Sequence, residues 1–69
     1  MDDRIDGEFT GWSGDTVFRL ENGQIWQQAE SAYLYSYAFN PRVLIYPSSG
    51  TWRMQVDGVT ETIAVRRLR

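Results

Sequence analysis

The side chains available for chemistry are carboxylates, hydroxyls, arginines and aromatic rings, because the 69-residue chain contains no histidine, cysteine or lysine. The usual general base, the thiolate nucleophile and the amine that forms Schiff bases are therefore missing. Asp15 and Asp57 stand beside glycines, where an aspartate commonly hydrogen-bonds its own turn. Asp2, Asp3 and Asp6 lack the spacing of a calcium loop. We predict that the chain is not an enzyme and that it holds no cofactor or metal.

Aromatic rings are the strongest candidates for binding. Tyrosines at 33, 35 and 37 alternate with smaller residues, and with Tyr46 they provide flat amphipathic rings like those that line peptide, glycan and single-strand grooves. Trp12 stands next to a Ser-Gly turn and is a further candidate. In the competing interpretation these rings cap a barrel or cover an edge strand. The candidate binding residues are Trp12, Tyr33, Tyr35, Tyr37 and Tyr46.

The charge balance bears on the partners. Nine acidic residues face seven basic ones, all arginine, for a net charge of −2. Such a chain attracts nucleic acid or anionic lipid weakly, so we expect a protein, peptide or glycan partner, or a second copy of the chain. The terminal Arg66-Arg67-Leu68-Arg69 run fits phosphate binding, but it fits a solvated strand end better. No segment has the length and apolarity of a membrane span. The compartment stays open between export, after removal of a signal peptide, and the cytoplasm.

Short strands must position these residues. Turn signals recur about every 8 to 12 residues, and the segments between them alternate with period two. This pattern predicts an all-β domain spanning residues 1–69, with residues 1–3 frayed, folded as an antiparallel barrel of five to six short strands. The turn signals are Ser13-Gly14-Asp15, Asn22-Gly23, Asn40-Pro41, Pro47-Ser48-Ser49-Gly50 and Asp57-Gly58.

The Asn22-Gly23 hairpin has two alternative registers. A two-residue turn would direct Trp26 away from the core, whereas a three-residue turn with Gly23 in a bulge brings it together with Phe18 and Leu20. We prefer the second register, because a small barrel needs so large an indole in its core.

Three further segments carry local predictions. Residues 4–12 are predicted to form a strand that is either strongly bent or closely approached by another backbone, since two glycines share a face with Phe9. Residues 29–40 fit either a strand with one aromatic face or a loop crossing the barrel. The Asp57-Gly58 turn predicts that Val56 pairs with Val59, which sets Met54 opposite Glu61.

Several motifs together resemble a known group. They are Ile5-x-Gly7-x-Phe9-x-Gly11-Trp12-x-Gly14, Phe18-x-Leu20-x-Asn22-Gly23-Gln24-x-Trp26-x-Gln28, Asn40-Pro41-x-Val43 and Val56-x-Gly58. The chain resembles small, poorly characterised bacterial domains with a Gly-Trp turn and an Asn-Gly-Gln-x-Trp hairpin. The resemblance covers nearly the whole chain and is most specific over residues 5–28. It implies a small SH3-like barrel from a bacterium, with export as a further implication. It implies no activity, and the tyrosine-rich stretch lies outside the shared pattern.

The leading functional hypothesis is a non-catalytic binding or interaction module that uses an aromatic surface. It predicts a contiguous exposed patch with at least two of the four tyrosines. A variant is self-association through that patch or through an open strand edge. Single-stranded nucleic-acid binding, by analogy with other small barrels, is the alternative from a second class. A carbohydrate enzyme with two carboxylates ranks last.

Overall fold

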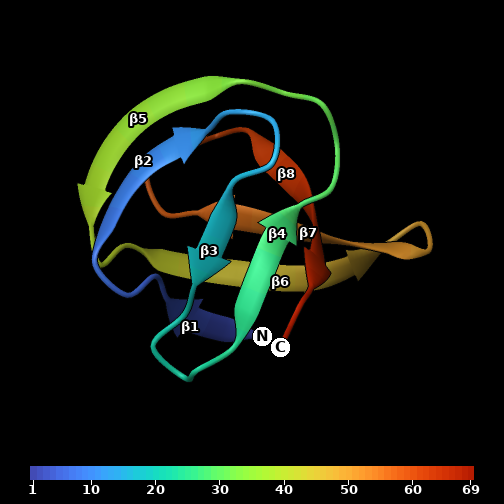
Figure 1. Ribbon diagram of the computed structural model, residues 1–69, viewed down its shortest axis with the longest axis horizontal. Coiled ribbons are helices and arrows are strands. Elements are labelled where there is room, and N and C mark those ends of the chain that lie inside the picture. The colour runs from blue at the N-terminus through green and yellow to red at the C-terminus, as the bar shows by residue number, and fades with distance from the viewer.

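The computed structural model describes residues 1–69 and is built entirely from strands and their connections (Figure 1). The eight strands are β1 (Asp2–Arg4), β2 (Glu8–Trp12), β3 (Val17–Arg19), β4 (Ile25–Gln28), β5 (Leu34–Phe39), β6 (Arg42–Ser48), β7 (Thr51–Val56) and β8 (Thr62–Arg67). The predicted all-β antiparallel class is confirmed. There is no helix with the length and apolarity to cross a membrane.

Six strands form one curled antiparallel sheet in the order β1-β6-β7-β8-β4-β3. Its two outer strands meet where Ile5 bridges Leu20, just beyond the ends of β1 and β3. Backbone hydrogen bonds of 2.8 and 2.9 Å flank this bridge. The curled sheet thus joins its own ends into a small barrel, and six strands match the predicted number.

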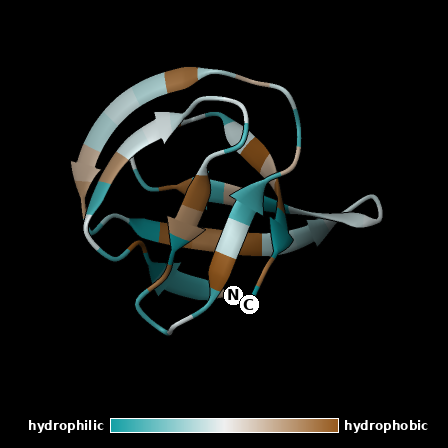
Figure 2. Ribbon diagram, in the orientation of Figure 1, coloured by the Kyte–Doolittle hydropathy of each residue, from teal (hydrophilic) through white to brown (hydrophobic).

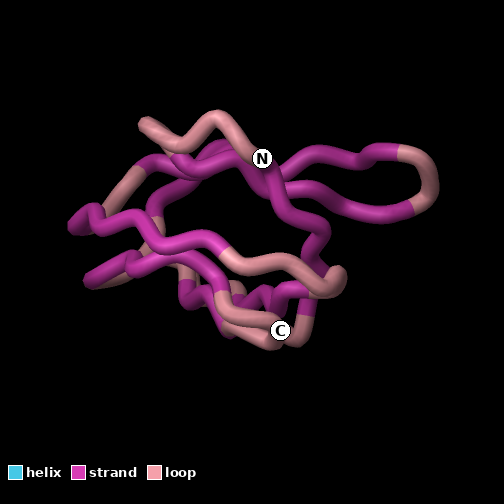
Figure 3. The backbone as a smooth tube through the Cα atoms, turned by 90° about the horizontal axis from the view of Figure 1, so that it is seen from above, coloured by secondary structure: helices cyan, strands magenta, loops and turns pink.

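Strands β2 and β5 form a second, two-stranded sheet that the predicted count did not include. This ribbon continues from β1 and β6 and arches over the barrel (Figures 1 and 3). At the bend, Gly7 has a φ of +91°, and its N–H donates to Asn40 Oδ1 at 2.7 Å. Asn40 N–H donates in turn to Gly7 O at 2.8 Å. The bent strand predicted for residues 4–12 is therefore two strands with a glycine corner between them.

The core draws on both the barrel and the ribbon (Figure 2). Phe9 and Trp12 point inward from β2, with 2% and 4% of their surfaces exposed. The Phe9 ring stacks on Phe18 of β3 at 6.5 Å and meets Trp12 edge-on at 6.2 Å. The burial of these two side chains holds the ribbon against the barrel, since each large aromatic side chain stabilises the fold by about 3 kcal/mol when it is buried.

The register of the β3–β4 hairpin is the one we preferred. Phe18 lies directly opposite Trp26, and the Leu20 N–H donates to Gln24 O at 2.9 Å. Three residues therefore form the loop, and Gly23 takes a φ of +91°. Phe18, Leu20 and Trp26 are all buried. The indole N–H keeps a partner, Gln24 Oε1, at 3.0 Å, as a buried donor requires.

The predicted register of the β7–β8 hairpin is wrong by two residues. A β-turn does form, with Val59 N–H donating to Val56 O at 2.9 Å. Met54 nevertheless pairs with Ile63 rather than Glu61. Because Met54 is fully buried, the predicted pairing would have set a carboxylate against the core. Because the shift is by two residues, the same face of β8 still points into the core, and Ile63 takes the place of the carboxylate opposite Met54.

The N-terminus, which was predicted to be frayed, is paired. Asp2 and Asp3 of β1 lie opposite Leu44 and Val43 of β6. The terminal ammonium of Met1 donates to the carbonyl of β6 residue Ile45 at 2.6 Å. Period-two patterning gave no sign of this strand because its side chains are polar and its role is to supply backbone pairing at the seam of the barrel.

Candidate binding surface

The tyrosine-rich stretch is a strand, β5, and not a loop across the barrel. Its even-numbered residues, Leu34, Ser36 and Ala38, are half-buried toward the barrel. Its odd-numbered residues point outward as a continuous row that begins with the residue before the strand. The exposed fractions are 76% for Tyr33, 84% for Tyr35, 56% for Tyr37 and 68% for Phe39. We call these four residues the aromatic strip.

Strand β2 holds the strip in place through an irregular pairing. Phe9 lies opposite Ala38, but Gly11 lies opposite Tyr35, so β5 has one more residue than β2 between the two pairs. This bulge accompanies a very close approach of the two backbones. A Cβ atom on Gly11 would overlap the carbonyl of Leu34, and it would lie 2.8 Å from the carbonyl carbon. Only glycine fits here, because its φ of +107° is also one that side chains disfavour.

One ring of the strip is tied to the neighbouring strand. Tyr37 donates its hydroxyl hydrogen to Glu8 Oε2 at 2.9 Å. This bond to the carboxylate raises the pKa of Tyr37, because it stabilises the protonated phenol. The outer face of the ribbon therefore carries a carboxylate beside its aromatic rings.

A pocket of about 360 Å³ lies at the start of the strip. Its lining combines aromatic faces with hydroxyl groups from the turn after β2. There, Ser13 N–H donates to Thr16 Oγ1 at 2.9 Å, and the two hydroxyls lie 3.3 Å apart. The lining residues are Thr10, Gly11, Trp12, Ser13, Thr16, Tyr33, Leu34 and Tyr35. Rings that offer a face and hydroxyls that offer donors and acceptors suit an amphipathic ligand group.

The structure brings three of the five predicted binding residues to this pocket: Trp12, Tyr33 and Tyr35. Trp12, however, is only 4% exposed, so it supports the pocket wall from the core and does not lie on the open surface. Tyr46 lies elsewhere, half-buried on β6 opposite Arg53. Strand β6 pairs with β1 and β7, so Tyr46 is not part of the strip.

Phe39 is the strip residue that was not named as a candidate. It continues the odd-numbered alternation of the three tyrosines, and this parity was a sufficient signal for it. Its position opposite Glu8 on β2 extends the strip to the end of the ribbon.

Charge is distributed unevenly around the strip. The segments that carry the strip and its pocket, residues 8–16 and 29–40, contain Glu8, Asp15 and Glu30 and no basic residue. All seven arginines belong to other segments. The two segments themselves therefore offer no cation for a phosphate; from other segments, Arg4 donates to Asn40 O at 2.9 Å at the end of the ribbon, and Arg53 pairs with Glu30. The rings and the Glu8 carboxylate suit neutral or positively charged groups.

Gln28 joins the two segments that border the pocket. Its side-chain oxygen accepts from Gly14 N–H at 2.8 Å and Thr16 N–H at 3.3 Å. Its amide nitrogen donates to Glu30 O at 3.0 Å and Ala32 O at 2.8 Å. The side chain is buried, and its whole bonding capacity on both atoms is used. Sequence reasoning missed this residue because a lone glutamine in a strand carries no signal of burial.

Glu30 fastens the same segment to the barrel. Its Oε2 atom accepts from Ala64 N–H of β8 at 2.8 Å and from Arg53 Nη2 of β7 at 2.7 Å. The bond from the Ala64 N–H lowers the pKa of Glu30, with Arg53 acting in the same direction. The chain leading into the aromatic strip is therefore held by a charged group.

We expect Glu30→Gln to make the free energy of unfolding depend less on pH in the acid range. The folded-state pKa lies below the ordinary value of 4.5, so the ionised carboxylate stabilises the fold above that pH. This stabilisation is lost as the pH falls through the folded-state pKa. The variant should lose about 1 kcal/mol at pH 7, a small amount because the pair is partly exposed, and less at pH 3. Urea unfolding across this pH range measures both, and equal losses at the two pH values would contradict the assignment.

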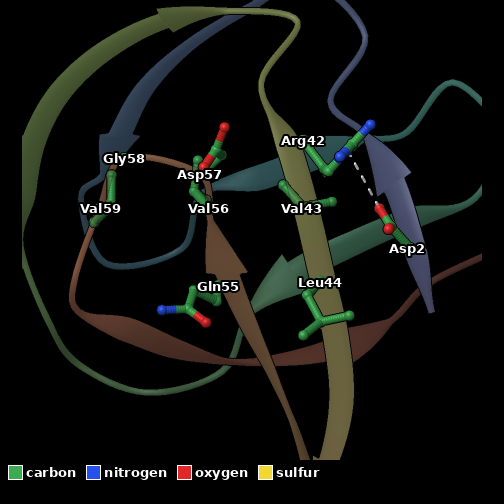
Figure 4. A pocket seen from close by; sticks show the side chains of 9 residues that line it. All are labelled: Asp2, Arg42, Val43, Leu44, Gln55, Val56, Asp57, Gly58 and Val59. Carbon is green, nitrogen blue, oxygen red and sulfur yellow. Dashed lines mark ion pairs between the residues drawn. The ribbon is translucent and has the colours of Figure 1, made fainter.

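A second depression, of about 380 Å³, lies beside β6 and the β7–β8 turn (Figure 4). Arg42 and Asp2 face each other across its rim at 3.8 Å, and both side chains are more than 60% exposed. So open an ion pair is strongly screened and carries little energy. The structure contains no group of three or more carboxylates placed to share a metal ion.

Comparison with known proteins adds no relative. No family model, no curated protein and no solved structure matches this chain. The small all-β barrel is therefore shown by the strands themselves, while its SH3-like and bacterial character stays a prediction from the sequence resemblance.

Proposed function

We propose that this chain is a non-catalytic interaction module whose binding surface is the aromatic strip with its adjoining pocket. The observation that carries this proposal is the exposure of four aromatic side chains in a row, each more than half open to solvent. Contiguous exposed apolar surface is uncommon on monomeric proteins and marks interaction sites. Tyrosine and phenylalanine are also enriched where proteins bind partners. The resemblance supports an SH3-like barrel of bacterial origin as the scaffold, and export as its route.

The chemistry of the strip favours a neutral or basic partner, either an extended polypeptide or a glycan. Rings stack on both kinds of ligand, and the hydroxyls of Ser13 and Thr16 supply hydrogen bonds at the pocket. A single-stranded nucleic acid suits the rings but not the charge, since the strip's own segments supply no arginine and the carboxylates of Glu8 and Asp15 form no ion pair. We therefore rank nucleic-acid binding second.

Small probes test the surface directly. We expect tyrosine amide or methyl glucoside, titrated to tens of millimolar, to shift the NMR signals of residues 33–39 and of the Ser13–Thr16 turn. Thymidine monophosphate should shift them much less. Tyr33→Ala should weaken probe binding about tenfold, or ~1.4 kcal/mol, because this ring borders the pocket.

Leu44→Ala is the matched control, since Leu44 is 46% exposed on β6, which does not pair with β5. It should leave the probe titrations unchanged. Shifts that cluster away from the strip, or unaltered binding by Tyr33→Ala, would contradict the proposal. A stronger response to the nucleotide than to the neutral probes would favour the nucleic-acid alternative.

A further inference from the structure

One long edge of β5 is free. The strand pairs with β2 and with no other strand, and no backbone hydrogen bond from any other segment reaches residues 34–39. The second edge of β2 is less open than that of β5, because it faces β3 across a groove lined by residues of both strands. The outer edge of β5 thus presents unpaired N–H and C=O groups beside the aromatic strip, which is a template for one more strand.

This edge lacks the charged and proline residues that usually keep strand edges apart. Residues 33–39 include no charged residue, no proline and no glycine. Charged side chains and prolines are the common means by which proteins block edge-to-edge pairing. A β-bulge, which is another such means, does occur on β5, where Ser36 and Tyr37 lie opposite the single residue Thr10. It leaves the alternation of buried and exposed residues along β5 intact. An edge of this kind can pair with another strand.

We infer that the occupant is β5 of a second copy of this chain, paired antiparallel about a two-fold axis at Ser36. This inference rests on the proposed function, because it names a partner for the same strip. Residues directly opposite in an antiparallel pair share a face, so Ser36 opposite its own equivalent sets Tyr35 opposite Tyr37 of the second copy. In the same register Tyr33 lies opposite Phe39, and Leu34 lies opposite Ala38.

The β5 sequence suits itself in this register. On the outer face every pair is aromatic on aromatic, a favourable cross-strand combination. On the inner face the pairs are small or apolar. No charged residue faces a charged residue across the axis, because residues 33–39 carry none. The Glu8 carboxylates lie on β2, one strand removed from the new interface in each copy, and each accepts the Tyr37 hydroxyl of its own chain.

The dimer is expected to be weak. Six strand residues span about 20 Å, and an edge contact of that length buries less than the roughly 1,200 Å² of a stable interface. A dissociation constant of about 10 µM to 1 mM follows. The partner strand is therefore exchangeable, which leaves the edge open to other extended segments.

Sedimentation velocity over about 10 µM to 2 mM tests the dimer with charged variants. Tyr35→Lys with Tyr37→Lys, and Tyr35→Glu with Tyr37→Glu, should each be monomeric, because like charges then lie opposite each other. An equimolar mixture of the two should associate at least tenfold more tightly than either alone. Leu44→Lys, on β6, should dimerise like the unaltered chain. Circular dichroism checks that the exposed substitutions keep the fold.

The outcomes separate the two proposals. If the unaltered chain stays monomeric at 2 mM, the dimer inference is overturned, while the probe titrations of the strip can still succeed. A dimer that Leu44→Lys abolishes, or a mixture of charged variants that does not associate, also overturns the β5 pairing. In an independent measurement on the unaltered chain, the NMR signals of residues 33–39 should move with protein concentration, and those of β7 should not. Movement confined to β7 would refute the inference.

Discussion

Gly11→Ala is expected to destabilise the domain by about 3–5 kcal/mol, close to the whole stability of a chain this short. Two costs combine at this position. The φ of +107° disfavours any side chain, and the new methyl group would overlap the backbone carbonyl of Leu34 on β5. A backbone atom cannot move aside as a flexible side chain can. The β2–β5 pairing must therefore open, and the aromatic strip loses its support.

Gly50→Ala is the matched control for that prediction. Gly50 also has a positive φ, +80°, but nothing lies within 4 Å of a Cβ added there. Its substitution should cost only about 1 kcal/mol, the conformational penalty alone. Urea unfolding followed by the fluorescence of the buried tryptophans measures both variants. Equal losses at the two glycines would show that close backbone approach is not what Gly11 provides.

Gln28→Leu is expected to cost about 3–4 kcal/mol, although the replacement is apolar and of similar size. The substitution removes four hydrogen bonds at once and leaves backbone groups of the Ser13–Thr16 turn and of residues 30–32 without partners. Each buried group left unpaired costs about 1–3 kcal/mol, offset partly where water can reach it. The pocket beside Tyr33 should loosen as well, so NMR signals of that turn should broaden.

Gln27→Leu tests the neighbouring glutamine on the opposite face of β4. Its side chain is half-exposed and bonds Arg66 and the carbonyl of Asp15 at the surface. Water replaces such bonds readily, so the loss should stay below about 1 kcal/mol. Thermal unfolding of the two variants side by side provides the comparison. A loss at Gln28 no greater than that at Gln27 would mean that the buried amide does not join the pocket walls.

Local turn chemistry predicted the β3–β4 hairpin well and the β7–β8 hairpin poorly. At Asn22-Gly23 the turn and the core agreed, because the bulged register also buries Trp26. At Asp57-Gly58 the turn forms, but the strands beyond it follow the core, which requires Ile63 beside Met54. A turn of two residues contributes little to stability compared with the burial of several side chains, so the core determines the register.

The aromatic strip was predicted in part for a similar reason. Alternation with period two placed Tyr33, Tyr35 and Tyr37 on one face, and the same rule extends to Phe39. Alternation does not indicate which face meets solvent, so it could not exclude the competing interpretation, in which the rings cap the barrel or cover an edge strand. Trp12 and Tyr46 lie outside the strip, and the sequence could not show this because adjacency to a turn and residue type say nothing about which strands pair. The first supports the pocket from the core, and the second lies on β6.

By itself, the sequence determined the class of this protein and the chemistry it lacks. Short-range rules suffice for both, since period-two alternation, turn residues and the absence of histidine, cysteine and lysine are properties of neighbouring positions or of composition. Tertiary structure alone decided that Ile5 meets Leu20 to close the barrel, that Gln28 joins the two walls of the pocket, and that β5 is left with a free edge. These features depend on contacts between segments far apart in the chain. Their energy comes from burial and from satisfying backbone groups over the whole fold, so no local pattern contains them.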